Sequence, residues 1–322
     1  MTGRVRPGSP AVPSIYDILS ATYSKRAFAT LDAPLSVLGR SWGYKLTLES
    51  THATRLEGLY TSAMSLPPTG SNSENQPAWS DHELDEGLHG RSDKARKVQK
   101  MFASIASSYD VNNRIHSFGL DRWWRHRVVK ALSPVEGLEV VDVACGTGDL
   151  SEAFERAGAR SVLGVDFTPE MLDIARARSR RARKTHIEYR EGDAMRLELE
   201  DGCADLVSIA FGIRNVAKPE QALAEFKRIL RPDGRLVVLE FSQPANPVIR
   251  WCNELYCNQL MPRTAAFLAR DRSGAYRYLP KSVSSFMSRT ELAAAIEAAG
   301  FTNLKLVPMS FGVCVAYIAD SS

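Results

Sequence analysis

The 322-residue sequence has few cysteines, and none of them form a Cys-x-x-Cys pair. The five cysteines are an odd number, at positions 145, 203, 252, 257 and 314. Neither a disulfide framework nor a structural metal site is therefore expected. This cysteine usage predicts a protein of a reducing compartment that holds no metal ion.

Long hydrophobic runs are also missing. No stretch of about 18 apolar residues occurs, so no segment is expected to span a bilayer. The formal net charge of +4 is mild and gives no reason to expect nucleic acid as a partner. The hydrophobic fraction of 44% is ordinary for a globular protein and is sufficient for a sizeable core.

Acidic residues are scarce at the N-terminus, where only Asp17 and Asp32 precede Glu49. Residues 1–92 carry scattered Pro, Gly, Ser and Thr without a sustained period, and residues 66–75 read as a linker. We expect a disordered or poorly ordered extension without chemistry. The basic, acid-poor composition leaves an organelle transit peptide as the alternative.

Regular patterns begin near residue 93. Short apolar or β-branched runs predict strands, and helical patterns alternate with them. The predicted strands cover residues 138–144, 161–166, 186–190, 204–210, 235–241, 303–307 and 312–318. Such alternation predicts a mostly parallel sheet covered on both faces, and the last two runs could pair as an antiparallel hairpin.

Two helix starts are marked by local signals. Thr168 precedes Pro169 and predicts an N-cap with proline at the first helical position. Ser288 and Glu291 have the spacing of a capping box, in a helix that ends near Gly300.

A glycine-rich loop follows the first strand, where residues 140–149 read VVDVACGTGD. Gly146 and Gly148 allow close backbone approach to a ligand, and the next helix offers free N–H donors. Asp166 ends the second strand, where a carboxylate can accept both ribose hydroxyls of a nucleoside. Asp193 follows the third strand, where an adenine would lie. These positions meet at the carboxyl edge of the sheet and predict a nucleotide-type cofactor.

Two cofactors fit this loop. A dinucleotide fingerprint would need a third glycine where Ser151 stands, which disfavours a dehydrogenase. The pattern Asp-x-Ala-x-Gly-x-Gly, with Asp166 after it, instead resembles the loop of Rossmann-like class I methyltransferases that bind S-adenosylmethionine (SAM). Ala144 stands where the first glycine of that loop is usual.

Three segments resemble the UbiE/MenG/Coq5 family of quinone-biosynthesis C-methyltransferases. Residues 109–113 (YDVNN), with Phe118 and Gly119 after them, are similar to its N-terminal signature. Residues 211–216 (FGIRNV) and 228–236 (RILRPDGRL) are similar to the next two. The resemblance covers about residues 93–320. Asn112 and Asp121 depart from it, since the family usually has Met and His there.

The resemblance implies a seven-stranded class I methyltransferase domain over residues 93–322, with a helical lid insertion near 245–285. It implies methyl transfer from SAM to a ring carbon of a prenylated quinol, with demethylmenaquinol as the leading acceptor. A polyprenyl-benzoquinol of ubiquinone synthesis remains an alternative, as does another acceptor such as RNA. A SAM-binding protein without catalysis is less favoured, because Thr147, Asp166 and Arg214 are intact.

Site roles are also implied by the resemblance. It puts Thr147, Asp166, Asp193 and Ala194 at cofactor-binding positions, beside Gly146 and Gly148 of the loop. Arg214 suits a developing phenolate but is a poor base, so we expect a water ordered by Tyr109, Arg214 and Asn215 to relay the proton. A structural ion pair for Arg214 and core packing for Tyr109 are the alternatives.

Surface features bear on partners. Apolar residues between 248 and 268 could cover a prenyl tail or lie on a bilayer, or could pack as an ordinary helix pair. The basic run from Arg176 to Lys184 reads as a solvated helix face, with anionic lipid or nucleic acid as alternatives. We expect a cytoplasmic enzyme that meets the inner membrane peripherally, with an organelle as alternative, and a homodimer is an open expectation.

Overall fold

The computed structural model describes residues 78–79, 82–83, 88, 91–261, 263 and 275–321. All of them belong to one compact unit, Pro68–Ser322. The expected disorder of residues 1–92 therefore lies almost entirely outside the described residues, as do Phe267 and Leu268 of the proposed lid.

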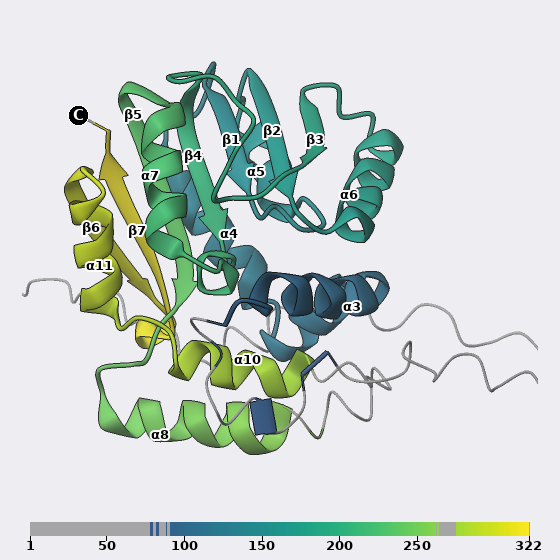
Figure 1. Ribbon diagram of the computed structural model, residues 1–322, viewed down its shortest axis with the longest axis vertical. Coiled ribbons are helices and arrows are strands. Elements are labelled where there is room, and N and C mark those ends of the chain that lie inside the picture. Colours follow the sequence, from purple (N-terminus) through teal and green to yellow (C-terminus); the bar gives the residue numbers. More distant parts are fainter. Residues whose placement is uncertain are drawn as a thin grey trace, which may run out of the picture. The chain divides into compact units, whose positions relative to one another are not determined.

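A seven-stranded sheet forms the centre of the molecule (Figure 1). Its strand order is β3-β2-β1-β4-β5-β7-β6. The first five strands are parallel, and β7 runs antiparallel between β5 and β6. The strands are β1 (Glu139–Val143), β2 (Ser161–Asp166), β3 (Ile187–Glu191), β4 (Ala204–Ala210), β5 (Leu230–Phe241), β6 (Thr302–Met309) and β7 (Cys314–Asp320). The predicted parallel sheet with a terminal antiparallel pair is confirmed.

One predicted strand is longer than its pattern suggested. β5 begins at Leu230 rather than near Arg235, because Leu230 pairs with Ala204 before the pairing shifts to Leu206 and Arg235. Residues 231–234 carry Pro, Asp and Gly, which hide the strand from a pattern search. The extra residues form a bulge, a feature set by pairing rather than by local preference.

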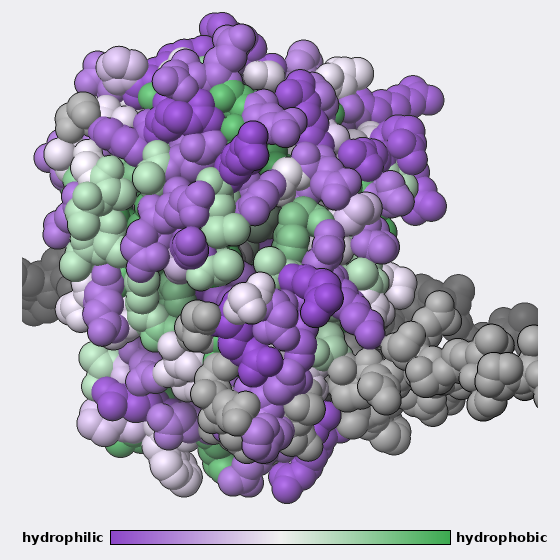
Figure 2. Space-filling view, viewed as in Figure 1, coloured by the Kyte–Doolittle hydropathy of each residue, from purple (hydrophilic) through white to green (hydrophobic). Residues whose placement is uncertain are grey.

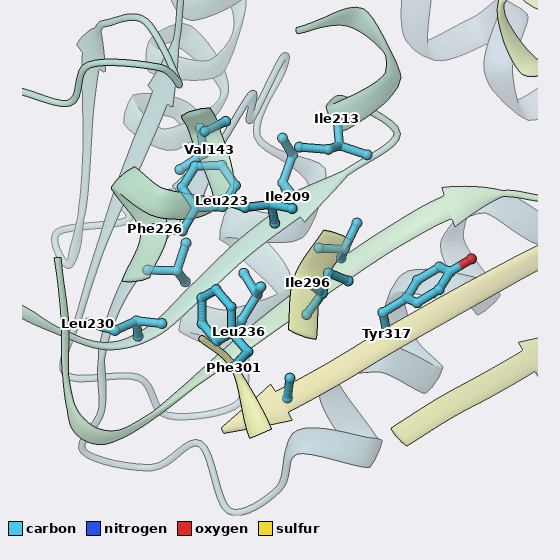
Figure 3. Close-up of a cluster of buried hydrophobic side chains, with 14 of the residues drawn as sticks. Val143, Ile209, Ile213, Leu223, Phe226, Leu230, Leu236, Ile296, Phe301 and Tyr317 are labelled. Carbon is cyan, nitrogen blue, oxygen red and sulfur yellow. The ribbon is translucent and has the colours of Figure 1, made fainter. Parts of the chain in front are cut away.

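Helices cover both faces of the sheet. The elements are α3 (Lys94–His116), α4 (Leu120–Leu132), α5 (Asp149–Arg156), α6 (Pro169–Arg181), η2 (Ile213–Asn215), α7 (Pro219–Ile229), α8 (Pro247–Leu255), η3 (Tyr256–Leu260), α10 (Ala275–Ser284), α11 (Arg289–Ala298) and η4 (Ser310–Gly312). α7 and α11 pack on one face, where Phe226 and Ile296 join a core cluster with Leu236 of β5 (Figure 3). α4 and α5 pack on the other face through Val128 and Phe154.

The predicted helix signals are largely confirmed. Ser288 and Glu291 form the expected capping box. Thr168 occupies the N-cap position before Pro169, but its side chain makes no capping hydrogen bond. Its backbone N–H instead donates to Asp166, so this helix start is held from the end of β2.

No helix within the described ranges is long and apolar enough to cross a membrane. Hydrophilic side chains cover most of the face that carries α7 and α11 (Figure 2).

Candidate active site

The loop between β1 and α5 meets the carboxyl end of β2 through Asp166. The carboxylate of Asp166 accepts from the backbone N–H of Gly146 at 2.8 Å and from that of Thr168 at 2.9 Å. Burial raises the pKa of this carboxyl, and the backbone donors oppose that shift. Asp166 therefore orders the glycine loop from the ribose-binding position predicted for it.

A cavity of about 120 Å³ lies at this edge of the sheet, and we call it the cofactor cavity. Four of the predicted cofactor residues line it: Gly146, Asp166, Asp193 and Ala194. Its wall also contains the apolar side chains of Met171 and Met195. A carboxylate beside an apolar slot suits the ribose and the base of an adenosyl group. The residues present therefore fit SAM.

Two predicted cofactor residues, Thr147 and Gly148, are not among those lining this cavity. Thr147 is buried, and its hydroxyl donates to Asp110 at 2.6 Å. Gly148 has φ +88°, and a Cβ built on it would lie 2.3 Å from the hydroxyl of Tyr189. Both residues fix the path of the loop, which only glycine could follow at position 148.

An ion-pair network behind the loop was missed by the sequence patterns. Arg178 of α6 pairs with Asp110 at 3.0 Å, with Asp149 at 2.6 Å and with Glu152 at 3.3 Å. Arg178 belongs to the basic run that we expected to be solvated. The network joins α3, α5 and α6, and the position of Asp110 beside Tyr109 in the N-terminal signature was the available signal.

Ser151 stands where a dinucleotide fingerprint would have its third glycine, and its side chain joins α5 to β1. It is fully buried, and its hydroxyl donates to Asp142 of β1 at 2.6 Å. Ser208 of β4 donates to the other oxygen of Asp142 at 2.6 Å. Burial raises the pKa of Asp142 to about 6, although both hydroxyls lower it. The helix α5 is thereby tied to β1 by a hydrogen bond.

A second cavity of about 670 Å³ lies next to the first, and we call it the acceptor cavity. Residues from α3, α4, α8, α10 and the end of β5 line it. Three aromatic side chains, Phe102, Tyr109 and Phe211, line both cavities. Burial raises the pKa of Tyr109, so its hydroxyl stays protonated at neutral pH. A group transferred between the two cavities would pass beside these side chains.

Arg214 lies in the wall of the acceptor cavity and is also part of a buried ion pair. Its Nη1 donates to Glu240 at 2.7 Å and to the carbonyl of Phe211 at 2.7 Å, and its Nε donates to Ser282 at 3.3 Å. Burial raises the pKa of Glu240, and Arg214 opposes that shift. The ion pair expected as the alternative role of Arg214 is therefore present, and the same side chain also lines the acceptor cavity.

Asn215 faces the cofactor cavity rather than the acceptor cavity. Its Oδ1 accepts from the hydroxyl of Tyr278 at 2.9 Å, and its Nδ2 donates to the carbonyl of Phe211 at 3.3 Å. The structure thus brings Tyr109 together with Arg214 in one cavity, and Tyr109 together with Asn215 in the other.

A buried lysine holds the turn that carries these residues. The ammonium of Lys94, at the start of α3, donates to the carbonyls of Arg214 and Val216, both at 2.8 Å. Burial and then the charge of Arg214 lower the pKa of Lys94 to about 8. Since 120 residues separate Lys94 from Arg214, no local pattern could have found this contact.

The region expected to form a lid contributes to the acceptor cavity. Arg250, Asn253 and Glu254 of α8 line it, and so do Tyr256 and Met261 after α8. The hydroxyl of Tyr256 donates to the carbonyl of His116 at 2.8 Å, which joins this region to the end of α3. Val248 and Trp251 of α8 are instead exposed.

Comparison with known proteins agrees with this geometry. Residues 91–320 match the sequence profile of the ubiE/COQ5 methyltransferase family. A demethylmenaquinone methyltransferase of Deinococcus radiodurans is 42% identical over 231 residues, which cover 71% of this chain and 95% of that protein. A ubiquinone/menaquinone biosynthesis C-methyltransferase UbiE of Roseobacter denitrificans is 40% identical, over 69% of this chain and 89% of that protein.

Solved structures agree on the fold. A SAM-dependent methyltransferase from Aquifex aeolicus has a TM-score of 0.50 at 17% identity, over 68% of this chain and 98% of that chain. With the sheet order, the two adjoining cavities and the family match together, the chain belongs to the ubiE/COQ5 methyltransferase family and is a SAM-dependent C-methyltransferase of quinone biosynthesis.

Proposed function

We propose that this enzyme methylates a ring carbon of a prenylated quinol and that demethylmenaquinol is its preferred acceptor. The observation that carries the proposal is the acceptor cavity of about 670 Å³, which has aromatic walls, contains Arg214 and shares Tyr109 with the cofactor cavity. Two similar proteins, from Deinococcus radiodurans and Thermus thermophilus, are named demethylmenaquinone methyltransferases. A benzoquinol acceptor is the second candidate, because relatives at 40% identity or below carry the name UbiE of ubiquinone/menaquinone biosynthesis.

The cofactor would be held by residues of the cofactor cavity. Asp166 accepts the ribose hydroxyls, while Asp193, Ala194 and Met195 surround the base. SAM supplies the methyl group that is transferred. Tyr109 and Phe211 line both this cavity and the acceptor cavity, so they lie at the boundary that the methyl group has to cross.

The acceptor carbon becomes nucleophilic when the ring hydroxyl beside it loses its proton. The Nη2 of Arg214 has no hydrogen-bond partner among the described residues, and it is the donor we assign to that ring oxygen. The fixed positive charge of Arg214 stabilises the phenolate in a site of low polarity. Because guanidinium stays protonated, a water molecule held by Tyr109 and Arg214 receives the proton. Asn215, engaged with Tyr278, fixes the turn around Arg214.

We further propose that the mouth of the acceptor cavity contacts a bilayer. The exposed large hydrophobic side chains of the described residues are Val111, Ile115, Phe118, Leu120, Trp123, Val248, Trp251, Leu255 and Phe311. They lie on or beside α3, α4, α8 and η4, and the first three of these segments also line the acceptor cavity. Exposed basic side chains such as Arg122 and Arg127 lie among them and suit anionic lipid headgroups.

The deciding experiment is methyl transfer from labelled SAM to reduced demethylmenaquinol and to a demethylated benzoquinol, side by side. Label in the menaquinol alone supports the proposal, and label in both supports one enzyme for two acceptors. Absence of label from both, while SAM still binds, would contradict the assignment of a quinol acceptor. The Arg214→Met variant is the control for transfer that does not depend on the site.

A further inference from the structure

A second guanidinium, that of Arg125 on α4, lies in the wall of the acceptor cavity. Its Cζ is 5.3 Å from the centre of the Phe211 ring. The Cζ of Arg214 is 5.4 Å from the centre of the Phe241 ring, and the two rings are 4.6 Å apart. Each of these two tilted phenylalanine rings therefore has one arginine beside it, and both arginines line the same cavity.

Arg125 is buried but uses only part of its hydrogen-bonding capacity. Its Nη1 donates to the backbone carbonyl of Asp121 at 3.0 Å and to the carboxylate at 3.2 Å. Its Nε and Nη2 have no hydrogen-bond partner in the part of the chain that the structure describes. Because Arg125 lines the acceptor cavity, these two donors are available to a ligand that enters it.

Asp121 fixes the direction of this guanidinium. Its other carboxylate oxygen accepts from the hydroxyl of Ser117 at 2.9 Å, and the side chain is 7% exposed. The carboxylate offsets the charge of Arg125, as Glu240 offsets that of Arg214. The wall of the cavity thus contains two similar ion pairs, each an arginine oriented by a buried carboxylate.

We propose that Arg125 binds the second ring oxygen of the acceptor, the one para to the oxygen that Arg214 receives. This inference rests on the proposed function. The carbon to be methylated is activated by the hydroxyl beside it, so the para hydroxyl needs no deprotonation and serves as an anchor. Arg125 donates to its oxygen, and the ring lies against the aromatic side chains between the two arginines. The enzyme then selects 1,4-dihydroxy rings over rings with one hydroxyl.

Paired substrates and paired variants test this assignment. The substrates are a short-tailed 1,4-dihydroxynaphthalene and the matching 1-naphthol that lacks the second hydroxyl. Wild-type enzyme is expected to favour the diol by about 10- to 100-fold in kcat/KM, the range for a hydrogen bond to a charged group. Arg125→Met should lower the rate on the diol to that on the naphthol and leave the naphthol nearly unchanged.

The control is Lys130→Met, which removes one positive charge from an exposed position on α4 outside the acceptor cavity. It should keep the preference of the wild type. An equal loss on both substrates in Arg125→Met would overturn the proposal, because it would mean a packing role. Since Arg125→Met leaves Asp121 without its partner, the double variant Asp121→Asn/Arg125→Met is measured as well and should show the same loss of preference.

Calorimetric binding of the two compounds separates this inference from the proposed function. If wild-type enzyme methylates neither compound, the proposed function fails, while the ratio of the two dissociation constants still decides on Arg125. Tighter binding of the diol in the wild type and equal binding in Arg125→Met would support the anchor. A preference that persists in Arg125→Met would overturn it.

Discussion

At the scale of single residues, the buried ion pair with Glu240 links the catalytic role proposed for Arg214 to the stability of the fold. Both side chains are nearly inaccessible to solvent, and each is the other's charge partner. Removing one of them leaves a buried charge without compensation, which generally destabilises a protein by about 3–5 kcal/mol. An inactive Arg214 variant therefore needs a control that keeps the fold intact.

We predict that Arg214→Met binds SAM almost normally but lowers turnover by about 100-fold or more, because the phenolate loses its cation. It should also unfold at a lower temperature. The double variant Arg214→Met/Glu240→Gln should recover much of the thermal stability and none of the turnover. Calorimetric SAM binding, thermal unfolding and single-turnover rates check this. If the double variant regained activity, Arg214 would have a structural role alone.

Asp142 gives a pH-dependent prediction. Its folded pKa is about 6 against an ordinary value of 3.8, so the folded protein binds this proton more tightly than the unfolded chain does. Stability is therefore lost as the pH rises from about 4 to 6, by about 3 kcal/mol. Asp142→Asn carries no such titration, so its stability relative to the wild type should improve by that amount between pH 4 and pH 7. Urea unfolding at both pH values tests this, and a constant difference would contradict it.

Most of the candidate site residues expected from the sequence line one of the two cavities, but most of their partners could not be predicted. Asp166 and the glycine loop stand out because local geometry dictates their residue types. Glu240 and Lys94 become visible as partners of Arg214 only when distant segments meet, since such contacts leave no periodic trace. The basic run shows the same limit: Arg178 looks like surface charge in the sequence, although three carboxylates surround it in the fold.

At the scale of elements, the turn at Ala144 after β1 packs closely against the turn at Gly212 after β4. A Cβ built on Gly212 would lie 2.6 Å from the Cβ of Ala144 and 3.0 Å from Ile209. Ala144 itself has φ +51°, a conformation that favours glycine, and it stands where the loop usually has glycine. The alanine in the first turn thus requires the glycine in the second.

We predict that Gly212→Ala destabilises the protein by about 1–3 kcal/mol and weakens SAM binding, because both turns line the cofactor cavity. Ala144→Gly alone should be nearly neutral. The double variant should recover part of both losses, since the nearest clash disappears. Thermal unfolding and calorimetry measure the coupling, and strictly additive effects would show that the two turns are independent.

The strand bounds were predicted well where the strand is a continuous run without proline or a turn inside it. β2 and β4 begin and end at the predicted residues. β5 exceeds its predicted range because its pairing passes through a bulge, and the insertion of β7 between β5 and β6 depends on contacts far apart in the chain. The conformational preferences of individual residues do not determine the order of strands in the sheet.

At the scale of the whole molecule, exposed apolar side chains gather on the segments around one cavity. We predict that the protein sediments with vesicles that contain anionic lipids, and that Phe118→Ser and Trp251→Ser each weaken this binding by about 10-fold or more. Methylation of a short-tailed acceptor should be unchanged. Thr185→Ser, an exposed and uncharged substitution outside this surface, serves as the control.

The vesicle assay can also exclude this arrangement. If both apolar variants bind vesicles as the wild type does, the surface does not meet lipid. Light scattering then measures whether the same substitutions dissociate a dimer. Dissociation would mean that the surface is an interface between two copies of the chain.

The turn of residues 213–215 is held from two directions, by Lys94 of α3 and by Tyr278 and Ser282 of α10. Neither helix belongs to the sheet, and the turn has only a few residues of its own. On warming, release of either helix would free the turn while the strands remain paired. Heat should therefore inactivate this enzyme at temperatures at which its sheet is still folded, and the loss should reverse on cooling.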